Sequence, residues 1–162
     1  MTHHLAQINI ATLKESIDSP LLADFVARLE EVNRLADGAP GFVWRLQSEQ
    51  GAAAAIQADD DPMIVVNLSV WESPKLLSDF VYGGGHLEVM RQRRKWFQQM
   101  RVYLALWWVP AGHLPSVAEA KARLAYLAQH GESAQAFTMR RIFPSPSSET
   151  SSVIAFRDSC PA

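Results

Sequence analysis

Hydrophobic and polar residues alternate from Ile64 to Trp71, and this period of two predicts a β-strand with two different faces. One face is aliphatic and consists of Ile64, Val66, Leu68 and Val70. The opposite face carries Val65, Asn67, Ser69 and Trp71. An amide, a hydroxyl and an indole on one side of a strand are typical of a pocket wall. We therefore expect helix packing against the aliphatic face and a pocket against the polar face.

Four other segments have the pattern of strands, at residues 5–12, 42–48, 103–110 and 136–143. The first of them repeats the pattern described above, because Gln7 and Asn9 lie opposite an aliphatic face. The segment at 103–110 is apolar on both sides, which favours a central or interfacial position in a sheet.

Helix signals separate these strands. A Ser-Pro pair and apolar residues at helical spacing predict a helix that ends at Asp37 and Gly38. A second Ser-Pro pair begins a helix at Pro74 that runs to about Tyr82. Glycines at 83–85 are then expected to form a hinge, and the helix resumes from His86 to about Arg101.

The C-terminal third adds one more helix and a tail. Ser116 and Glu119 form a capping box, and Gly131 is positioned as the C-cap of the same helix. Residues 51–62 end in three aspartates and are predicted to be an exposed hairpin connection. The Ser- and Pro-rich tail from Pro144 is expected to be a surface loop, in which Val153 to Phe156 could pair briefly.

The order of these elements is the split βαβ arrangement of ferredoxin-like folds, an α+β class with an antiparallel sheet. With both helices on one face of the sheet, the other face would be bare although it carries Trp71 and Trp107 or Trp108. A second copy of the same sheet is the simplest cover, so we expect a homodimeric α/β barrel with a cavity between sheet and helices in each subunit. The domain spans residues 1–144 and the surface tail 145–162.

Composition narrows the classes of protein. The chain has 162 residues, 48% of them hydrophobic, and a formal net charge of -2, which fits one domain that binds no nucleic acid. The densest basic run is interpreted as the solvated side of a helix, and it consists of Arg91, Arg93, Arg94 and Lys95. The single cysteine, Cys160, favours a reducing cytoplasm. Neither a signal peptide nor an apolar run of membrane-spanning length is recognisable, so a cytoplasmic location without membrane contact is expected.

Three runs of sequence carry a family resemblance: LAQINIA, WESPKLLSDFVY and LWWVPAGHLPSVAEAKARLAYLAQHGESAQAFTMRRIFP. They look like a family of bacterial domains without an assigned function, DUF3291, over the chain to about Pro144. More broadly, the layout and the run VWESPKLLSDFVYGGGH resemble the dimeric α/β-barrel superfamily, which contains antibiotic-biosynthesis and haem-degrading monooxygenases. The narrower resemblance implies a fold and no activity.

The broader resemblance implies candidate catalytic residues. Its monooxygenases carry an asparagine on the first strand and a tryptophan at the end of the third, and the haem degraders add a histidine on the next helix. The matching positions here are Asn9, Trp71 and His86, although the spacing from Trp71 to His86 is longer than in the haem degraders.

Each candidate has a structural alternative. The amides of Asn9 and Asn67 could bind a substrate carbonyl or a reduced-oxygen intermediate, or be buried and satisfied by backbone. Trp71 could stack on a flat aromatic substrate or pack in the core. His86 could be a general base, a haem ligand, or a cap on the glycine turn. The remaining expected pocket residues are Trp107, Trp108 and His113, the last held in a turn between two prolines.

Three functions remain open. The first is a cofactor-independent monooxygenase that oxidises a phenol or quinol with O2, its partners being a second copy of itself and a small aromatic molecule. The second is a haem-binding or haem-degrading protein with His86 as ligand. The third is a non-enzymatic ligand-binding dimer whose tryptophans fill the interface. The histidines lack the regular spacing of a zinc site, and glycine-rich phosphate loops and serine or cysteine nucleophile motifs are missing.

Overall fold

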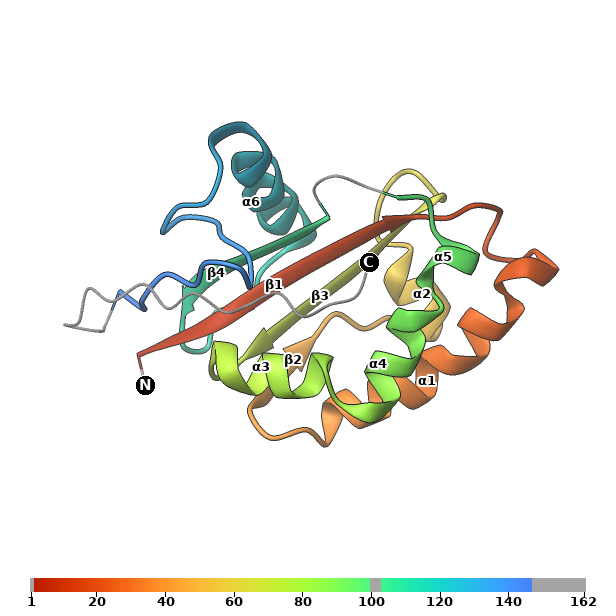
Figure 1. Ribbon diagram of the computed structural model, residues 1–162, viewed down its shortest axis with the longest axis horizontal. Coiled ribbons are helices and arrows are strands. Elements are labelled where there is room, and N and C mark those ends of the chain that lie inside the picture. The colour runs from red at the N-terminus through yellow and green to blue at the C-terminus, as the bar shows by residue number, and fades with distance from the viewer. Residues whose placement is uncertain (1, 100–102, 147–162) are drawn as a thin grey trace.

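A computed structural model describes residues 2–99 and 103–146 (Figure 1). Its four-stranded sheet has the order β2-β3-β1-β4, and every neighbouring pair is antiparallel. The strands are β1 (His3–Thr12), β2 (Phe42–Arg45), β3 (Ile64–Trp71) and β4 (Leu104–Pro110). The helices are α1 (Ala23–Asp37), α2 (Ala52–Ile56), α3 (Pro74–Val81), α4 (Gly84–Arg91), α5 (Arg93–Trp96) and α6 (Val117–His130), with a 3-10 turn, η1 (Pro20–Leu22), before α1. This strand order confirms the predicted α+β, ferredoxin-like fold.

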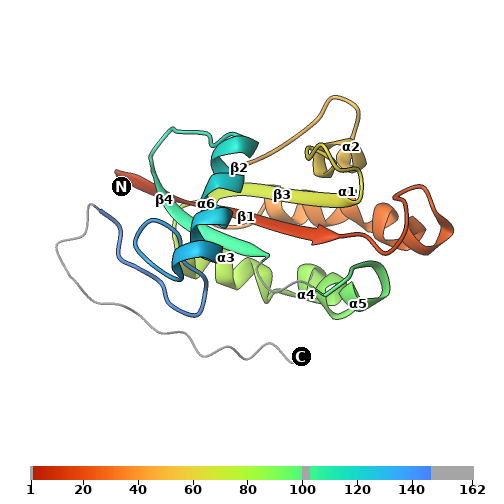
Figure 2. The same cartoon turned by 90° about the horizontal axis from the view of Figure 1, so that it is seen from above.

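The register of the two central strands places their polar residues on one face. Gln7 lies opposite Ser69, and Asn9 lies opposite Asn67. Directly opposed residues of an antiparallel pair project to the same side, so the partly polar faces of β1 and β3 join into one surface. Helices α3, α4 and α5 gather together on one side of the strands (Figure 2).

Both faces of the sheet are covered within the chain, which corrects the expectation that the face carrying Trp71 is bare. Leu77 and Phe80 of α3 pack against Trp71, and α6 covers the aliphatic face. Ile8, Leu68 and Val70 on that face are each at most 1% exposed. They belong to a core cluster that includes Ala120, Leu124 and Leu127 of α6. Helix α6 therefore covers part of the face that α1 and α3 leave free. The homodimer stays a prediction.

Two connections differ from the prediction. Residues 51–62 contain helix α2, because four consecutive alanines follow Gly51 and alanine is the strongest helix former. Asp59, in the loop after α2, forms an ion pair of 2.7 Å with Lys121 of α6. The helix expected to reach Arg101 ends at Trp96, whose side chain is 1% exposed. Phe97 then bridges Leu13 in extended conformation, which ends the helical hydrogen bonding.

The predicted last strand at 136–143 is wrong among the described residues. Only Phe137 pairs with the sheet, through two backbone hydrogen bonds of 2.8 and 2.9 Å with Leu106 on the free edge of β4. The chain then turns between Thr138 and Arg141, so no ladder can form. Strand β2 is also shorter than predicted, because after Arg45 a single backbone bond, from Leu46 to Leu68, continues the pairing.

The tail lies mostly outside the described residues. The expected pairing at 153–156 and Cys160 fall there. Within residues 2–99 and 103–146, no helix combines the length and apolarity needed to cross a membrane.

Candidate functional site

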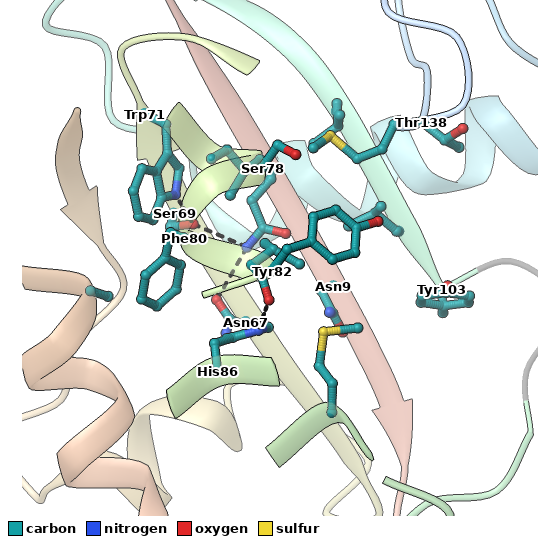
Figure 3. A pocket seen from close by; sticks show the side chains of 18 of the residues that line it. Asn9, Asn67, Ser69, Trp71, Ser78, Phe80, Tyr82, His86, Tyr103 and Thr138 are labelled. Carbon is teal, nitrogen blue, oxygen red and sulfur yellow. Dashed lines mark hydrogen bonds between the residues drawn. The ribbon is translucent and has the colours of Figure 1, made fainter. Parts of the chain in front are cut away.

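A cavity of about 810 Å³ lies between the polar face of the sheet and helices α1, α3 and α4. Asn9, Asn67, Trp71 and His86 all line it, so the structure brings the three expected catalytic residues and one expected pocket residue to a single hollow. Figure 3 shows them together, from two strands and one helix. The size is within the range of small-molecule sites.

Hydrogen bonds between side chains organise the floor of the cavity. The Ser69 hydroxyl oxygen accepts from Trp71 Nε1 at 2.9 Å and from Gln7 Nε2 at 3.0 Å. Gln7 Nε2 also donates to Asn67 Oδ1 at 3.2 Å. The lone pairs of Ser69 and the side-chain oxygen of Asn67 are therefore engaged within the floor. The donors left over are the Ser69 O–H and the Asn67 NH₂, beside the acceptor oxygen of Gln7. The floor offers hydrogen-bond donors to a ligand.

The two asparagines differ in their setting. Asn67 is exposed although it projects from a central strand, whereas Gln7 and Ser69 beside it are 8% and 6% exposed. Solvent or a ligand can therefore reach Asn67 through the cavity. Asn9 is half-buried directly across the strand pair.

Trp71 lies beneath the cavity and presents almost no surface to it. The indole is 1% exposed, Phe80 stacks on it at 5.1 Å, and Phe42 meets its edge at 5.6 Å. The ring face that was expected to receive a flat substrate is thus taken by Phe80. Trp71 instead holds Ser69 and Phe80 in place.

His86 has a defined tautomer. Its Nδ1 lies 3.1 Å from the carbonyl oxygen of Val81, and because a carbonyl can only accept, Nδ1 carries the proton. The lone pair of the neutral ring is then on Nε2. Burial lowers the pKa of His86 from its ordinary 6.5, and the bond to Val81 opposes this more weakly.

The glycine break explains how this ring reaches the cavity. A Cβ on Gly85 would lie 2.4 Å from Cδ1 of Leu35, so the absent side chain lets α4 approach α1 closely. Helix α4 begins at Gly84, which puts His86 in its first turn, just after the end of α3. Figure 3 shows Phe80 between Trp71 and His86, with ring centroids 5.1 Å from each.

Three expected pocket residues lie elsewhere. Trp107 projects from the opposite face of the sheet and is completely buried. Trp108 is on the cavity side, but its Nε1 donates to the carbonyl of Phe143 at 2.9 Å and it does not line the cavity. The alternation of β4 separates the two indoles, which sequence alone could not orient.

His113 is a turn residue. Its Nε2 lies 3.0 Å from a carboxylate oxygen of Glu119 and outside the cavity. Glu119 is therefore engaged by His113, while its backbone N–H donates to the Ser116 hydroxyl at 3.1 Å. Neither Trp107 nor Trp108 fills the cavity.

Several residues that line the cavity were not predicted from the sequence as site residues. Gln7 and Ser69 had been recognised as polar, and the strand register would have placed them beside Asn67. Phe80 and the 41%-exposed Tyr82 and Tyr103 reach the cavity only through the packing of α3 and β4. No group of three or more histidine, cysteine, aspartate or glutamate side chains is placed to hold a metal ion in the described part of the chain.

The chain was compared with known proteins. No curated protein matches it. Among solved structures it is similar to PA3566 from Pseudomonas aeruginosa, at 12% identity and TM-score 0.45 over 71% of this chain and 98% of that one. It is also similar to a proposed antibiotic biosynthesis monooxygenase from Nitrosomonas europaea, at 18% identity and TM-score 0.40 over 70% and 93%.

A third similar structure is SnoaB, a cofactor-independent oxygenase from Streptomyces nogalater, at 15% identity and TM-score 0.42 over 74% of this chain and 100% of that one. A family model supplies the assignment, since the domain of unknown function DUF3291 matches residues 4–153. The chain belongs to the DUF3291 family.

Proposed function

We propose that the protein is a cofactor-independent monooxygenase that oxidises a phenolic or quinol substrate with O2. The observation that carries the proposal is the His86 imidazole, held through Nδ1 by the Val81 carbonyl, in one cavity with the donors of Asn67 and Ser69. A base and a set of hydrogen-bond donors are what deprotonation of an aromatic hydroxyl requires.

The proposed reaction begins with proton transfer. The substrate hydroxyl donates to His86 Nε2, and the ring becomes imidazolium with Nδ1–H still bonded to Val81. The phenolate that forms is stabilised by the NH₂ of Asn67 and the O–H of Ser69. Because an electron-rich phenolate is a much stronger reductant than the phenol, it can pass electrons to O2 directly.

The electrons balance without an added reductant. A hydroquinone and O2 give a hydroxyquinone and water: one oxygen atom enters a new C–O bond, and the other leaves as water. The quinol supplies all four electrons that O2 takes up. The phenyl ring of Phe80, beside His86, would contact the substrate ring.

Oxygen uptake tests the proposal. Aerobic incubation with a panel of hydroquinones, in buffer containing a metal chelator, is expected to consume O2 faster than buffer alone and to place ¹⁸O from ¹⁸O2 in the product. His86→Asn should slow this by about 10²-fold or more, the usual contribution of a general base. The matched control is His113→Asn, which alters a histidine outside the cavity and should leave the rate unchanged. Equal rates in wild type and His86→Asn would overturn the proposal.

The same imidazole supports a second candidate, a haem site with His86 as axial ligand. A histidine whose Nδ1–H is bound to a backbone carbonyl has the arrangement common to metal-bound imidazoles, with Nε2 directed to the metal. A bound haem would supply its own redox chemistry at iron. Titration with haem would then give a Soret band that His86→Asn shifts or abolishes, and its absence rules this candidate out.

A ligand-binding function without chemistry is the remaining outcome. It predicts saturable binding of an aromatic molecule with no O2 uptake and no Soret band.

A further inference from the structure

The cavity has a basic corner that the proposed chemistry does not use. Among the ionisable side chains lining it in the described part of the chain, the cations are Arg45, Arg93, Arg94 and Arg140, and the single carboxylate is Glu132. The chain as a whole has a net charge of -2. The charge of the cavity lining is therefore opposite in sign to that of the protein.

Neighbouring groups neutralise part of this charge. Arg45 forms two hydrogen bonds with the carboxylate of Asp37, at 2.7 and 3.1 Å. Glu132 accepts a hydrogen bond from the Thr138 hydroxyl, which is uncharged. Arg140 is exposed and makes an interaction of its own, so α5, with Arg93 and Arg94, is the cationic end of the cavity.

The arginines of α5 have no ion-pair partner among the described residues. Arg93 is half-buried, and no carboxylate of the described residues lies within ion-pair distance of it. The ammonium of Lys14 adds a further cation, because it donates to the backbone carbonyl of Arg94. The sequence pattern predicts a solvated helix face for this basic run, but Arg93 and Arg94 line the cavity whereas Arg91 and Lys95 do not.

From these observations the geometry points to a substrate that carries an anionic group, a carboxylate or a phosphate, bound by Arg93 and Arg94 at the α5 end of the cavity. This inference rests on the proposed function for the identity of the reacting hydroxyl and adds the class of its substrate. A guanidinium presents paired N–H donors that match a carboxylate or phosphate, and it stays charged at every physiological pH.

Helix geometry sets the spacing of the two recognition points. Arg93 follows His86 by seven residues, and the chain between them is helical except for the turn at Gln92 that separates α4 from α5. A rise of 1.5 Å per residue therefore gives a separation on the order of 10 Å or less. Met90 lies between them and also lines the cavity. A ring system of two or three fused rings spans such a distance, so the reacting hydroxyl and the anionic group lie at opposite ends of the molecule.

Binding of a matched pair of probes tests the inference without requiring turnover. Anthraquinone-2-carboxylate and anthraquinone-2-carboxamide have the same shape and differ in charge. Calorimetric titration is expected to give about tenfold tighter binding of the carboxylate, the scale of one charge-assisted hydrogen bond. An anthraquinone carrying a phosphate at the same position, titrated in parallel, identifies which of the two anions is preferred.

Two variants assign the preference to α5. Arg93→Gln should reduce the tenfold difference between carboxylate and carboxamide, and Arg93→Gln combined with Arg94→Gln should abolish it. Arg91→Gln, which changes an exposed arginine outside the cavity, should preserve the difference. Should Arg93→Gln fail to fold, raising the salt concentration on wild type serves instead, because screening weakens binding of the carboxylate and leaves the carboxamide unaffected. Equal affinity of the two probes for wild type, or a preference that survives the double variant Arg93→Gln with Arg94→Gln, overturns the inference.

The two proposals fail separately. Oxidation of neutral quinols together with equal affinity for both probes removes the anionic substrate and keeps the oxygenase. A carboxylate preference that depends on Arg93, without O2 uptake by any quinol, removes the oxygenase and keeps the anion site.

Discussion

At the scale of single residues, the site depends on polar side chains that satisfy one another on a strand face. Gln7 donates its amide hydrogens to Asn67 and Ser69. The two buried residues, Gln7 and Ser69, therefore avoid the energetic cost of an unpaired polar group. Trp71 uses its only donor on the same serine. Atoms that are hydrogen-bonded within the floor of the cavity are unavailable to a ligand. A ligand therefore meets the donors of Asn67 and Ser69 that these bonds leave over.

The pH dependence of activity follows from His86. Burial lowers its pKa below the ordinary 6.5, so the neutral, basic form persists to lower pH than for a free histidine. We expect kcat/KM for a quinol at pH 6.5 to remain above half of its value at pH 8, and to reach half only at more acid pH. A rate that already halves at 6.5 or above would contradict the burial of this ring.

The same shift affects stability. Because the pKa of His86 is lower in the folded protein than in the unfolded chain, its contribution is complete above 6.5 and is lost as the pH falls from 6.5 through the folded pKa. The urea midpoint of His86→Asn should therefore vary less between pH 7.5 and 5.5 than that of wild type. The asparagine amide can still donate to the Val81 carbonyl, so stability at pH 7.5 serves as the control.

At the scale of elements, two serines begin helices at Ser-Pro pairs, and only one of them caps. The Ser73 hydroxyl accepts from the backbone N–H of Leu76 at 3.3 Å. Ser19 makes no such bond, because the chain enters α1 through η1, and its hydroxyl is buried without a partner among the described residues. The same sequence signal therefore has different energetic consequences.

Replacing each serine by alanine separates the two cases. Ser73→Ala is expected to lower the free energy of unfolding by about 1 kcal/mol, the usual value of an N-cap. Ser19→Ala should leave stability unchanged or raise it slightly, since it removes an unsatisfied buried hydroxyl. Urea unfolding of both variants measures the difference, and equal losses would mean that Ser19 does cap α1 in solution.

Gly41 lies in the connection between α1 and β2 and packs against Leu76 of α3. Gly41 has φ +82°, and a Cβ there would lie 2.6 Å from Cβ of Leu76. Gly41→Ala is expected to cost about 3 kcal/mol, from left-handed backbone strain and the clash together. Gly51→Ala is the matched control, because its φ is +103° but nothing lies within 4 Å. Gly51→Ala should lower the free energy of unfolding through backbone strain alone. Equal losses of unfolding free energy in the two variants, measured by urea unfolding, would exclude a packing role for Gly41.

At the scale of the whole molecule, the single chain already buries most of its apolar sheet. Helix α6 packs with the centre of the aliphatic face, while Trp44, Leu46 and Ile64 around it stay only partly buried. These residues are the surface that we expect a second copy to cover. We expect light scattering to give twice the 18.0 kDa of one chain at micromolar concentration. A mass of 18.0 kDa would mean that α6 suffices as cover and that the cavity works in a monomer.

The sequence by itself determined the strand pattern and, through it, the fold. The alternation in β1 and β3 identified which side chains share a face, because a strand has a period of two whatever surrounds it. It therefore placed Asn9, Asn67 and Trp71 on one surface. The Ser-Pro and glycine signals located α1, α3 and α4 because they depend on local backbone geometry.

Only the tertiary structure decided what those side chains face. The stacking of Phe80 on Trp71, the opposite orientations of Trp107 and Trp108, and the meeting of His86 with the polar strand face all depend on how separate elements pack. Burial of the aliphatic face by α6, and the inward position of Arg93, likewise depend on contacts between residues far apart in sequence. Local periodicity carries no information about such contacts, because many packings satisfy the same pattern of apolar residues.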